Sequence, residues 1–232
     1  MSRVKAGRSK ASAPKALIAW SSGKDSAFAL HVARRSLDCE IVGALTTVSD
    51  AFRRVSIHGV REDVLHAQCA AAGLPLRIVP IPYPCPNEIY EQAMAAAMHA
   101  ARTEGITRIV FGDLFLSDIR AYRERALAGS GIAPVFPLWG RPTAALAREM
   151  IAEGLEATIV AIDRKALPDS FAGRPFDATT LTALPDTVDP CGENGEFHTC
   201  VSGGPMFGSR ITLRRGDAVI RDGMTYVDLT LA

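Results

Sequence analysis

Short apolar runs alternate with longer amphipathic stretches through the first half of the chain. The strand-like runs begin at Ala16 and recur at 40–48, 76–81 and 108–111. Apolar residues at helical spacing fall between them, at 25–37, 59–72 and 88–104. This alternation predicts an α/β fold, a doubly wound and mainly parallel sheet with helices on both faces and ligands at the carboxyl ends of its strands.

The pattern changes after about Gly129. The stretch 132–140 is rich in proline and aromatic residues, which favours a crossover or pocket wall over a regular element. A helix at 143–153 and a strand at 157–162 are predicted next, and short β-rich runs separated by turns from 209 onward are typical of antiparallel strands. We therefore predict three parts: a basic leader (1–15), an α/β domain (16–130) and a smaller α+β domain (131–232).

Composition and charge narrow the class of protein. The chain has 232 residues, of which 48% are hydrophobic and 22% charged, as expected of a globular protein. Its formal charge is +1, but the first fifteen residues carry five basic side chains and no acidic one, so the body is mildly acidic. This argues against a nucleic-acid-binding surface, and we expect the leader to be disordered. No apolar stretch approaches membrane-spanning length and no secretion signal is evident, so a cytoplasmic location is expected.

The cysteines indicate neither a disulfide framework nor a zinc site. There are five, an odd number, and no two form a C-x-x-C pair. Cys191 and Cys200 flank a polar motif, where a catalytic thiol is one option and a small packing residue the favoured one.

The turn Ser21–Ser26, with the sequence SSGKDS, lies between the first strand and the first helix. Backbone N–H groups at a helix start, small hydroxyls and one lysine form a cradle for phosphates, in which Gly23 allows close approach and Lys24 supplies charge. A Walker A loop is excluded because Ile18 and Asp25 occupy two of its required positions. The alternative is a polar turn in which Ser22 or Asp25 caps the helix.

Gly112 and Asp113 follow the fourth strand-like run. They should therefore lie at the same sheet edge as the phosphate cradle. Asp113 could meet Mg²⁺ or a ribose hydroxyl, or could cap a helix, and the residues alone leave these open.

A second polar cluster lies between Asp189 and Phe207. Its chemistry-bearing members are Glu193, Asn194, Glu196, His198 and Thr199. Alternation along an extended segment would place Glu196 and His198 on one face, where a carboxylate and an imidazole could position a nucleophile, accept a proton from ammonium or hold a metal. For His198 taken alone, a structural role is the competing interpretation.

Two motifs carry a family resemblance. The turn resembles the PP-loop of ATP pyrophosphatases (S-G-G-K-D-S), with Ser22 in place of a glycine. The run CGENGEFHT at 191–199, followed by GPMF, resembles the signature of the diphthine–ammonia ligase family. Further agreements are His58-Gly59-Val60, Gln68, Gly112-Asp113 and Pro137-Leu138-Trp139.

The resemblance implies a fold of the PP-loop, or adenine nucleotide α-hydrolase, type and an ATP-dependent amide ligase. Such an enzyme adenylates a carboxylate, releases AMP and pyrophosphate, and transfers ammonia, with ATP and Mg²⁺ as cofactors. The implied catalytic residues are Lys24, Asp113, Glu196 and His198. The implied nucleotide site comprises Ser21, Ser22, Gly23, Lys24, Asp25, Ser26, His58, Gly112 and Asp113, with Asp25 and Asp113 as metal ligands. The implied substrate contacts are Glu193, Asn194, Glu196, His198 and Thr199.

The partners expected from the resemblance are a carboxylate, on a small molecule or a modified protein residue, and ammonium. We expect no membrane or nucleic-acid partner, and the sequence leaves a homodimer open. Two alternatives remain: a PP-loop enzyme that modifies tRNA, and a non-enzymatic sensor of adenine nucleotides.

Overall fold

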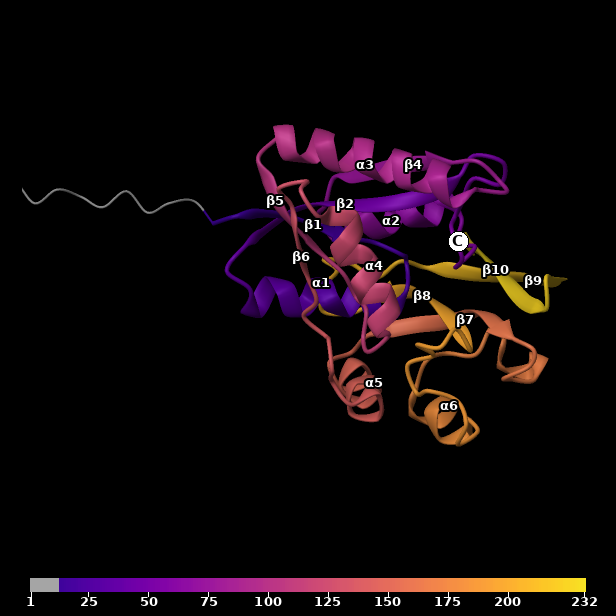
Figure 1. The fold of residues 1–232 in the computed structure, drawn as a ribbon. Coiled ribbons are helices and arrows are strands. Elements are labelled where there is room, and N and C mark those ends of the chain that lie inside the picture. The colour runs from indigo at the N-terminus through magenta and orange to yellow at the C-terminus, as the bar shows by residue number, and fades with distance from the viewer. Residues whose placement is uncertain (1–12) are drawn as a thin grey trace, which may run out of the picture.

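The first sheet forms the centre of the α/β region. The structure, a computed structural model, describes residues 13–232 (Figure 1). Five strands of this six-stranded sheet run parallel: β1 (Lys15–Ala19), β2 (Glu40–Ser49), β4 (Leu76–Ile81), β5 (Ile106–Val110) and β6 (Ala133–Val135). The short β3 (Arg54–Val55) pairs antiparallel with the end of β2.

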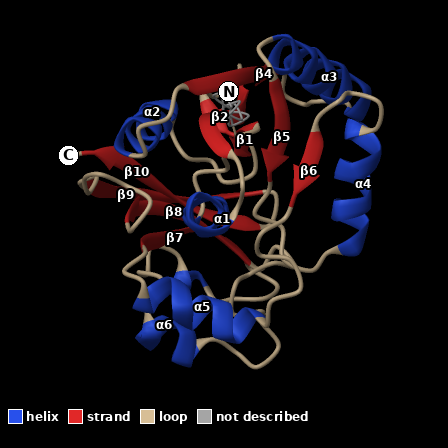
Figure 2. Cartoon of the chain, turned by 90° about the vertical axis from the view of Figure 1, so that its left-hand side faces the viewer, coloured by secondary structure: helices blue, strands red, loops and turns tan. Residues whose placement is uncertain are grey.

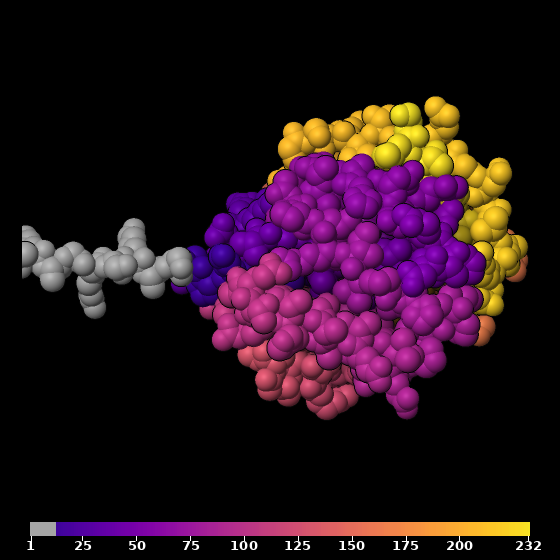
Figure 3. All heavy atoms as spheres, turned by 90° about the horizontal axis from the view of Figure 1, so that it is seen from above, coloured from indigo at the N-terminus to yellow at the C-terminus, as the bar shows by residue number. Residues whose placement is uncertain are grey.

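The second sheet has four antiparallel strands in the order β8-β7-β10-β9. They are β7 (Glu156–Asp163), β8 (Phe197–Gly203), β9 (Leu213–Arg221) and β10 (Met224–Leu231). In the space-filling view, this C-terminal part packs directly along the purple N-terminal part (Figure 3). The predicted α/β fold with a smaller C-terminal α+β region is confirmed.

The helices separate and cover the two sheets (Figure 2). Helices α1 (Lys24–Ser36) and α2 (Glu62–Ala71) lie between the sheets, where α1 contacts β2 and β8 and α2 contacts β10. Helices α3 (Asn87–Thr103) and α4 (Ser117–Leu127) cover the opposite face of the first sheet, and α5 (Thr143–Ala152) and α6 (Ala178–Ala183) lie beyond the second. A single 3₁₀ turn is described at Asp169–Phe171.

Alternation along β1 explains why the first sheet is buried on both faces. Ala16 and Ile18 join the core that α1 shares with the second sheet, whereas Leu17 joins the core beneath α3 and α4. All three side chains are fully buried. Successive strand residues point to opposite faces, so a continuous apolar run suits a strand covered on both sides.

Two elements of the structure, β6 and α4, differ from the sequence predictions. The prediction that 132–140 contains no regular element is wrong at its start, because Ala133–Val135 forms β6 beside β5. The helix α4 was not anticipated, since its sequence is mostly polar and only Leu127 is buried.

The expected disorder of the leader falls on residues that lie mostly outside the described range, and Lys15 is the first residue of β1. Among residues 13–232, no helix is long and apolar enough to cross a membrane.

Candidate functional site

The turn between β1 and α1 is closed by its own hydroxyl groups. Ser26 Oγ donates to the Gly23 carbonyl at 3.0 Å and accepts from the Ser21 N–H at 3.2 Å. The hydroxyls of Ser21 and Ser26 lie 3.1 Å apart. Gly23 is the N-cap residue of α1, so neither Ser22 nor Asp25 acts as the cap that was weighed against phosphate binding. A helix start at the end of a parallel strand presents backbone N–H groups in the geometry that binds anions.

Ser22 adopts the left-handed backbone conformation, with φ of 69°. It occupies the position at which the PP-loop pattern has glycine, the residue that takes positive φ without steric cost. Its hydroxyl is buried and has no hydrogen-bond partner. The turn therefore keeps the glycine-like backbone shape at an energetic cost.

Two glycines let other segments pack against this turn. A Cβ on Gly112 would lie 2.7 Å from the Asp25 carbonyl carbon, so the end of β5 contacts the turn backbone directly. A Cβ on Gly23 would lie 2.6 Å from Cε1 of His58. At Gly112 the contacts are with backbone atoms, so glycine is required for this close approach. At Gly23 a side chain would displace the His58 ring.

Strand β8 of the second sheet is hydrogen-bonded to the same turn. The Lys24 N–H donates to the Thr199 hydroxyl at 3.0 Å, and the Val201 N–H donates to the Ser22 carbonyl at 2.9 Å. Gln68, fully buried on α2, donates to the carbonyls of Val201 (2.7 Å) and Ser22 (3.2 Å). These bonds hold the two sequence motifs together across more than 170 residues.

The two motifs line one cavity of about 380 Å³. The first sheet and its loops contribute Ser21, Asp25, Ser26, His58, Gly112 and Asp113 to the wall. The second motif contributes Gly192, Glu193, Phe197 and His198. The structure therefore brings most of the expected site residues to a single place. Ser22, Gly23, Lys24, Asn194, Glu196 and Thr199 are not among the residues that line it.

Lys24 is buried and does not line the cavity. Its side chain is 2% exposed, and Nζ donates to Asp25 Oδ2 at 2.8 Å and to the Cys191 carbonyl. The ammonium also lies 5.3 Å from the centre of the Phe197 ring. Burial acts to lower the pKa of Lys24, but its hydrogen bond to Asp25 and the nearby charges, of which Asp25 is the main one, together outweigh burial. The pKa of Lys24 is therefore raised, and the side chain stays charged. In this geometry Lys24 links the two motifs and does not face a ligand.

The two glutamates of the second motif differ in position. Glu193 lines the cavity and accepts a hydrogen bond from the Leu114 N–H at 2.8 Å. Burial raises its pKa to about 7, so it gains or loses a proton near neutral pH. Glu196, in contrast, accepts from the Asp189 N–H (2.9 Å) and from Asn194 Nδ2 (3.0 Å). Glu196 and Asn194 therefore shape the loop, and Glu196 does not share the pocket of His198 as alternation suggested.

His198 instead pairs with His58. Their ring centroids are 4.8 Å apart at an interplanar angle of 44°. His58 Nδ1 lies 3.1 Å from the Thr199 carbonyl oxygen, which fixes the ring. Burial lowers the pKa of His58 to about 4 and that of His198 to about 3. Both imidazoles are therefore neutral at pH 7 and can accept as well as donate hydrogen bonds.

Arg123 lines the cavity, and no motif in the sequence pointed to it. Its Nε and Nη2 donate to the two oxygens of Asp113, at 2.7 and 3.0 Å, and its guanidinium lies 4.4 Å from the centre of the Phe111 ring. Among the described residues that line the cavity, it is the one lysine or arginine. The spacing of ten residues from Asp113 was no signal in itself, because α4 was not predicted.

The residues present fit a divalent cation in part. Asp25 Oδ1 is buried without a hydrogen-bond partner, and Asp25 and Asp113 both line the cavity. Within residues 13–232 no cluster of three metal-ligating side chains is found. One or two carboxylates completed by phosphate oxygens are what Mg²⁺ commonly uses, so this donor set suits Mg²⁺ bound together with a nucleotide.

The fold and the site define an α/β protein of the PP-loop class, with the turn Ser21–Ser26 at the carboxyl edge of a parallel sheet and an antiparallel C-terminal sheet packed against it. Within that class, the chain belongs to the diphthamide synthase family. The family model of the diphthamide synthase N-terminal domain matches residues 14–134, and that of the C-terminal domain matches residues 142–230. The family assignment made from the two motifs is confirmed.

Relatives with assigned functions match part of the chain. The diphthine–ammonia ligase of Rattus norvegicus is 32% identical over 117 residues, which cover 48% of this chain and 44% of that protein. The diphthine–ammonia ligase of Danio rerio is 32% identical over 111 residues, covering 45% of this chain and 44% of that protein. The diphthine–ammonia ligase of Bos taurus is 30% identical over 110 residues, which cover 45% of this chain and 41% of that protein. The chain thus spans less than half of the length of these relatives.

Proposed function

We propose that the chain is an ATP-dependent ligase that adenylates a carboxylate and then replaces AMP with ammonia. The observation that supports this most directly is the shared cavity, in which the phosphate-binding turn faces Glu193 and His198. Membership in the diphthamide synthase family and the names of the relatives point to the same reaction class.

In the first step, an oxygen of the substrate carboxylate attacks the α-phosphorus of ATP. The bond between the α-phosphorus and the oxygen bridging to the β-phosphate breaks, and pyrophosphate leaves. Ser21, Ser26 and the start of α1 would bind the pyrophosphate group through hydroxyls and backbone N–H groups. Asp25 and Asp113 would hold Mg²⁺, which supplies positive charge to the phosphates.

In the second step, ammonia attacks the carbonyl carbon of the acyl-adenylate and AMP leaves. Ammonium must lose a proton before its nitrogen can attack. Glu193, whose pKa is raised to about 7 by burial, would accept this proton inside the cavity. The neutral imidazoles of His58 and His198 would orient the nitrogen or the carbonyl by hydrogen bonds.

Lys24, Asn194, Glu196 and Thr199 act in this scheme as positioning residues. Their hydrogen bonds hold the turn and the second motif in place, as described above. The substrate remains a carboxylate on a small molecule or on a modified protein residue. The cytoplasmic location, the homodimer and the division at 130–131 stay predictions from the sequence.

The test is to incubate the purified chain with Mg-ATP, ammonium and a panel of carboxylates, and to identify the phosphorus products by ³¹P NMR. AMP with pyrophosphate is expected, and hydroxylamine in place of ammonium should trap the acyl-adenylate as a hydroxamate. ADP with phosphate would contradict the proposal. Glu193→Gln and His198→Ala should abolish turnover while ATP binding persists, whereas both changes would leave the response of a nucleotide sensor intact.

A further inference from the structure

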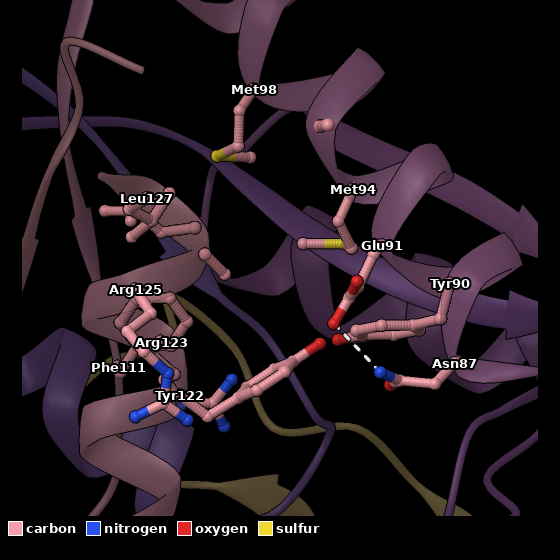
Figure 4. A pocket seen from close by; sticks show the side chains of 13 residues that line it. Asn87, Tyr90, Glu91, Met94, Met98, Phe111, Tyr122, Arg123, Arg125 and Leu127 are labelled. Carbon is pink, nitrogen blue, oxygen red and sulfur yellow. Dashed lines mark hydrogen bonds between the residues drawn. The ribbon is translucent and has the colours of Figure 1, made fainter. Parts of the chain in front are cut away.

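A second cavity, of about 570 Å³, lies between α3 and α4 (Figure 4). Its inner wall is apolar, formed by Met94, Met98, Ile109, Phe111 and Leu127. The polar side chains come from the first turns of α3 and from α4, and the close-up shows Tyr122 and Glu91 near each other (Figure 4). An apolar wall with a few polar groups is the usual form of a small-molecule site.

This second cavity adjoins the first one. Four residues line both: Tyr90, Met94, Phe111 and Arg123. A ligase of the proposed kind must hold a nucleotide and a carboxylate at the same time. The first cavity, of about 380 Å³, has the size of a site for one small ligand. The second cavity is the adjoining space in which the other substrate can lie.

The charged side chains where the two cavities meet indicate which kind of ligand can bind there. Arg123 lies where the cavities meet, and its third nitrogen, Nη1, makes no hydrogen bond within residues 13–232. Arg125 also lines the second cavity, whereas its one acid, Glu91, already accepts a hydrogen bond from Asn87 at 2.8 Å. Asp113 offsets the charge of Arg123, but the remaining Nη1 can still donate to a carboxylate. The apolar wall favours an apolar group beside that carboxylate.

We propose that the cavity between α3 and α4 binds the acid that is amidated, and that this acid has an apolar body. The body lies against Met94, Met98 and Phe111, and the carboxylate meets Arg123 at the junction, on the side of Asp113 and the phosphate-binding turn. This inference rests on the proposed ligase function and names its substrate class.

Binding of model acids tests the inference directly. The full chain, saturated with α,β-methylene-ATP, is titrated with 3-phenylpropanoate, octanoate, their primary amides and acetate by calorimetry. The two apolar acids should bind at least tenfold more tightly than either amide or acetate. Failure of both acids to bind, or equal binding of acids and amides, would overturn the inference.

Four variants locate the site. Ala126→Phe, at an exposed position on α4 that lines the cavity, should weaken binding of both acids at least tenfold. Its control is Ala96→Phe, exposed on α3 outside the cavity lining, which should change binding less than twofold. Arg123→Gln should weaken binding of the acids at least tenfold and change binding of the amides little. Arg125→Gln should weaken binding of the acids by a smaller factor. Unchanged melting temperature and nucleotide affinity show that Ala126→Phe is folded.

The failure of this inference can be told apart from failure of the ligase function. If a carboxylate drives formation of AMP and pyrophosphate at the same rate in Ala126→Phe as in the unmodified chain, the function stands and the cavity assignment is wrong. If the acids bind as described but no carboxylate drives cleavage of ATP, the cavity assignment stands and the function is wrong.

Discussion

The backbone N–H of Lys24 donates to the hydroxyl of Thr199 at 3.0 Å, and this bond joins the first turn of α1 to β8 across 175 positions of sequence. It directs one of the N–H groups at the start of α1 to the C-terminal domain instead of to a ligand. The C-terminal domain therefore takes part in shaping the phosphate-binding turn.

Replacing Thr199 with valine should test this connection. The side chain keeps its shape, but the buried N–H of Lys24 loses its partner, which should cost about 1–3 kcal/mol of unfolding free energy. We also expect weaker ATP binding, because the turn is no longer held by β8. Denaturant unfolding and nucleotide titration measure the two effects. The control is Thr103→Val, at an exposed position at the end of α3, where the change should be within ~0.5 kcal/mol.

Ser22→Gly should stabilise the protein. Glycine takes the left-handed conformation at position 22 without steric cost and removes a buried hydroxyl that has no partner. A gain of about 0.5–1 kcal/mol is expected, measured as a higher melting temperature. Ser22→Ala removes the hydroxyl but keeps a side chain in the left-handed conformation, so it should raise the melting temperature less than Ser22→Gly. Destabilisation by Ser22→Gly would show that the hydroxyl is satisfied in solution.

Gly112→Ala should disrupt the nucleotide site. The added methyl group would lie 2.7 Å from the Asp25 carbonyl carbon, so the end of β5 and the turn must move apart. We expect loss of ATP binding with a cost of about 1–3 kcal/mol in stability. Gly208→Ala is a matched control, since its Cβ would lie 3.6 Å from the nearest backbone atom and its φ is not positive. Equal ATP binding by both variants would contradict the close approach.

The neutral histidine pair predicts acid sensitivity. Burial lowers the pKa of His198 to about 3, below the unfolded value of about 6.5, so the unfolded chain binds a proton that the folded chain does not. The contribution of the neutral His198 to the free energy of unfolding is fully present above about pH 6.5 and is lost as the pH falls toward 3. His198→Gln should therefore flatten the decline of unfolding free energy between about pH 6.5 and 4, and the exposed His66→Gln should not. Identical pH profiles for His198→Gln and the unmodified chain would contradict a neutral buried imidazole.

Local patterns in the sequence were sufficient for most of the fold. The apolar run at Ala16 followed by a helical stretch predicted β1 and α1 within one or two residues, and the same holds for β2, β4 and α3. The element types follow from the period of the apolar residues, which each segment carries by itself. Helix α4 and β6 were not predicted, because a mostly polar helix and a three-residue strand show too little periodicity of apolar residues.

The sequence by itself determined where the turn Ser21–Ser26 lies and that it joins a strand to a helix, because a strand, a glycine-containing turn and a helix start are a local arrangement. Only the tertiary structure decided which side chains face the cavity. Lys24 turned to the Cys191 carbonyl and Asp25, Glu196 turned to its own loop, and Arg123 came to the cavity from an unexpected helix. The direction of the Lys24 side chain depends on a partner 167 positions away, and such contacts are set by how the two sheets pack and not by the spacing of residues along the chain.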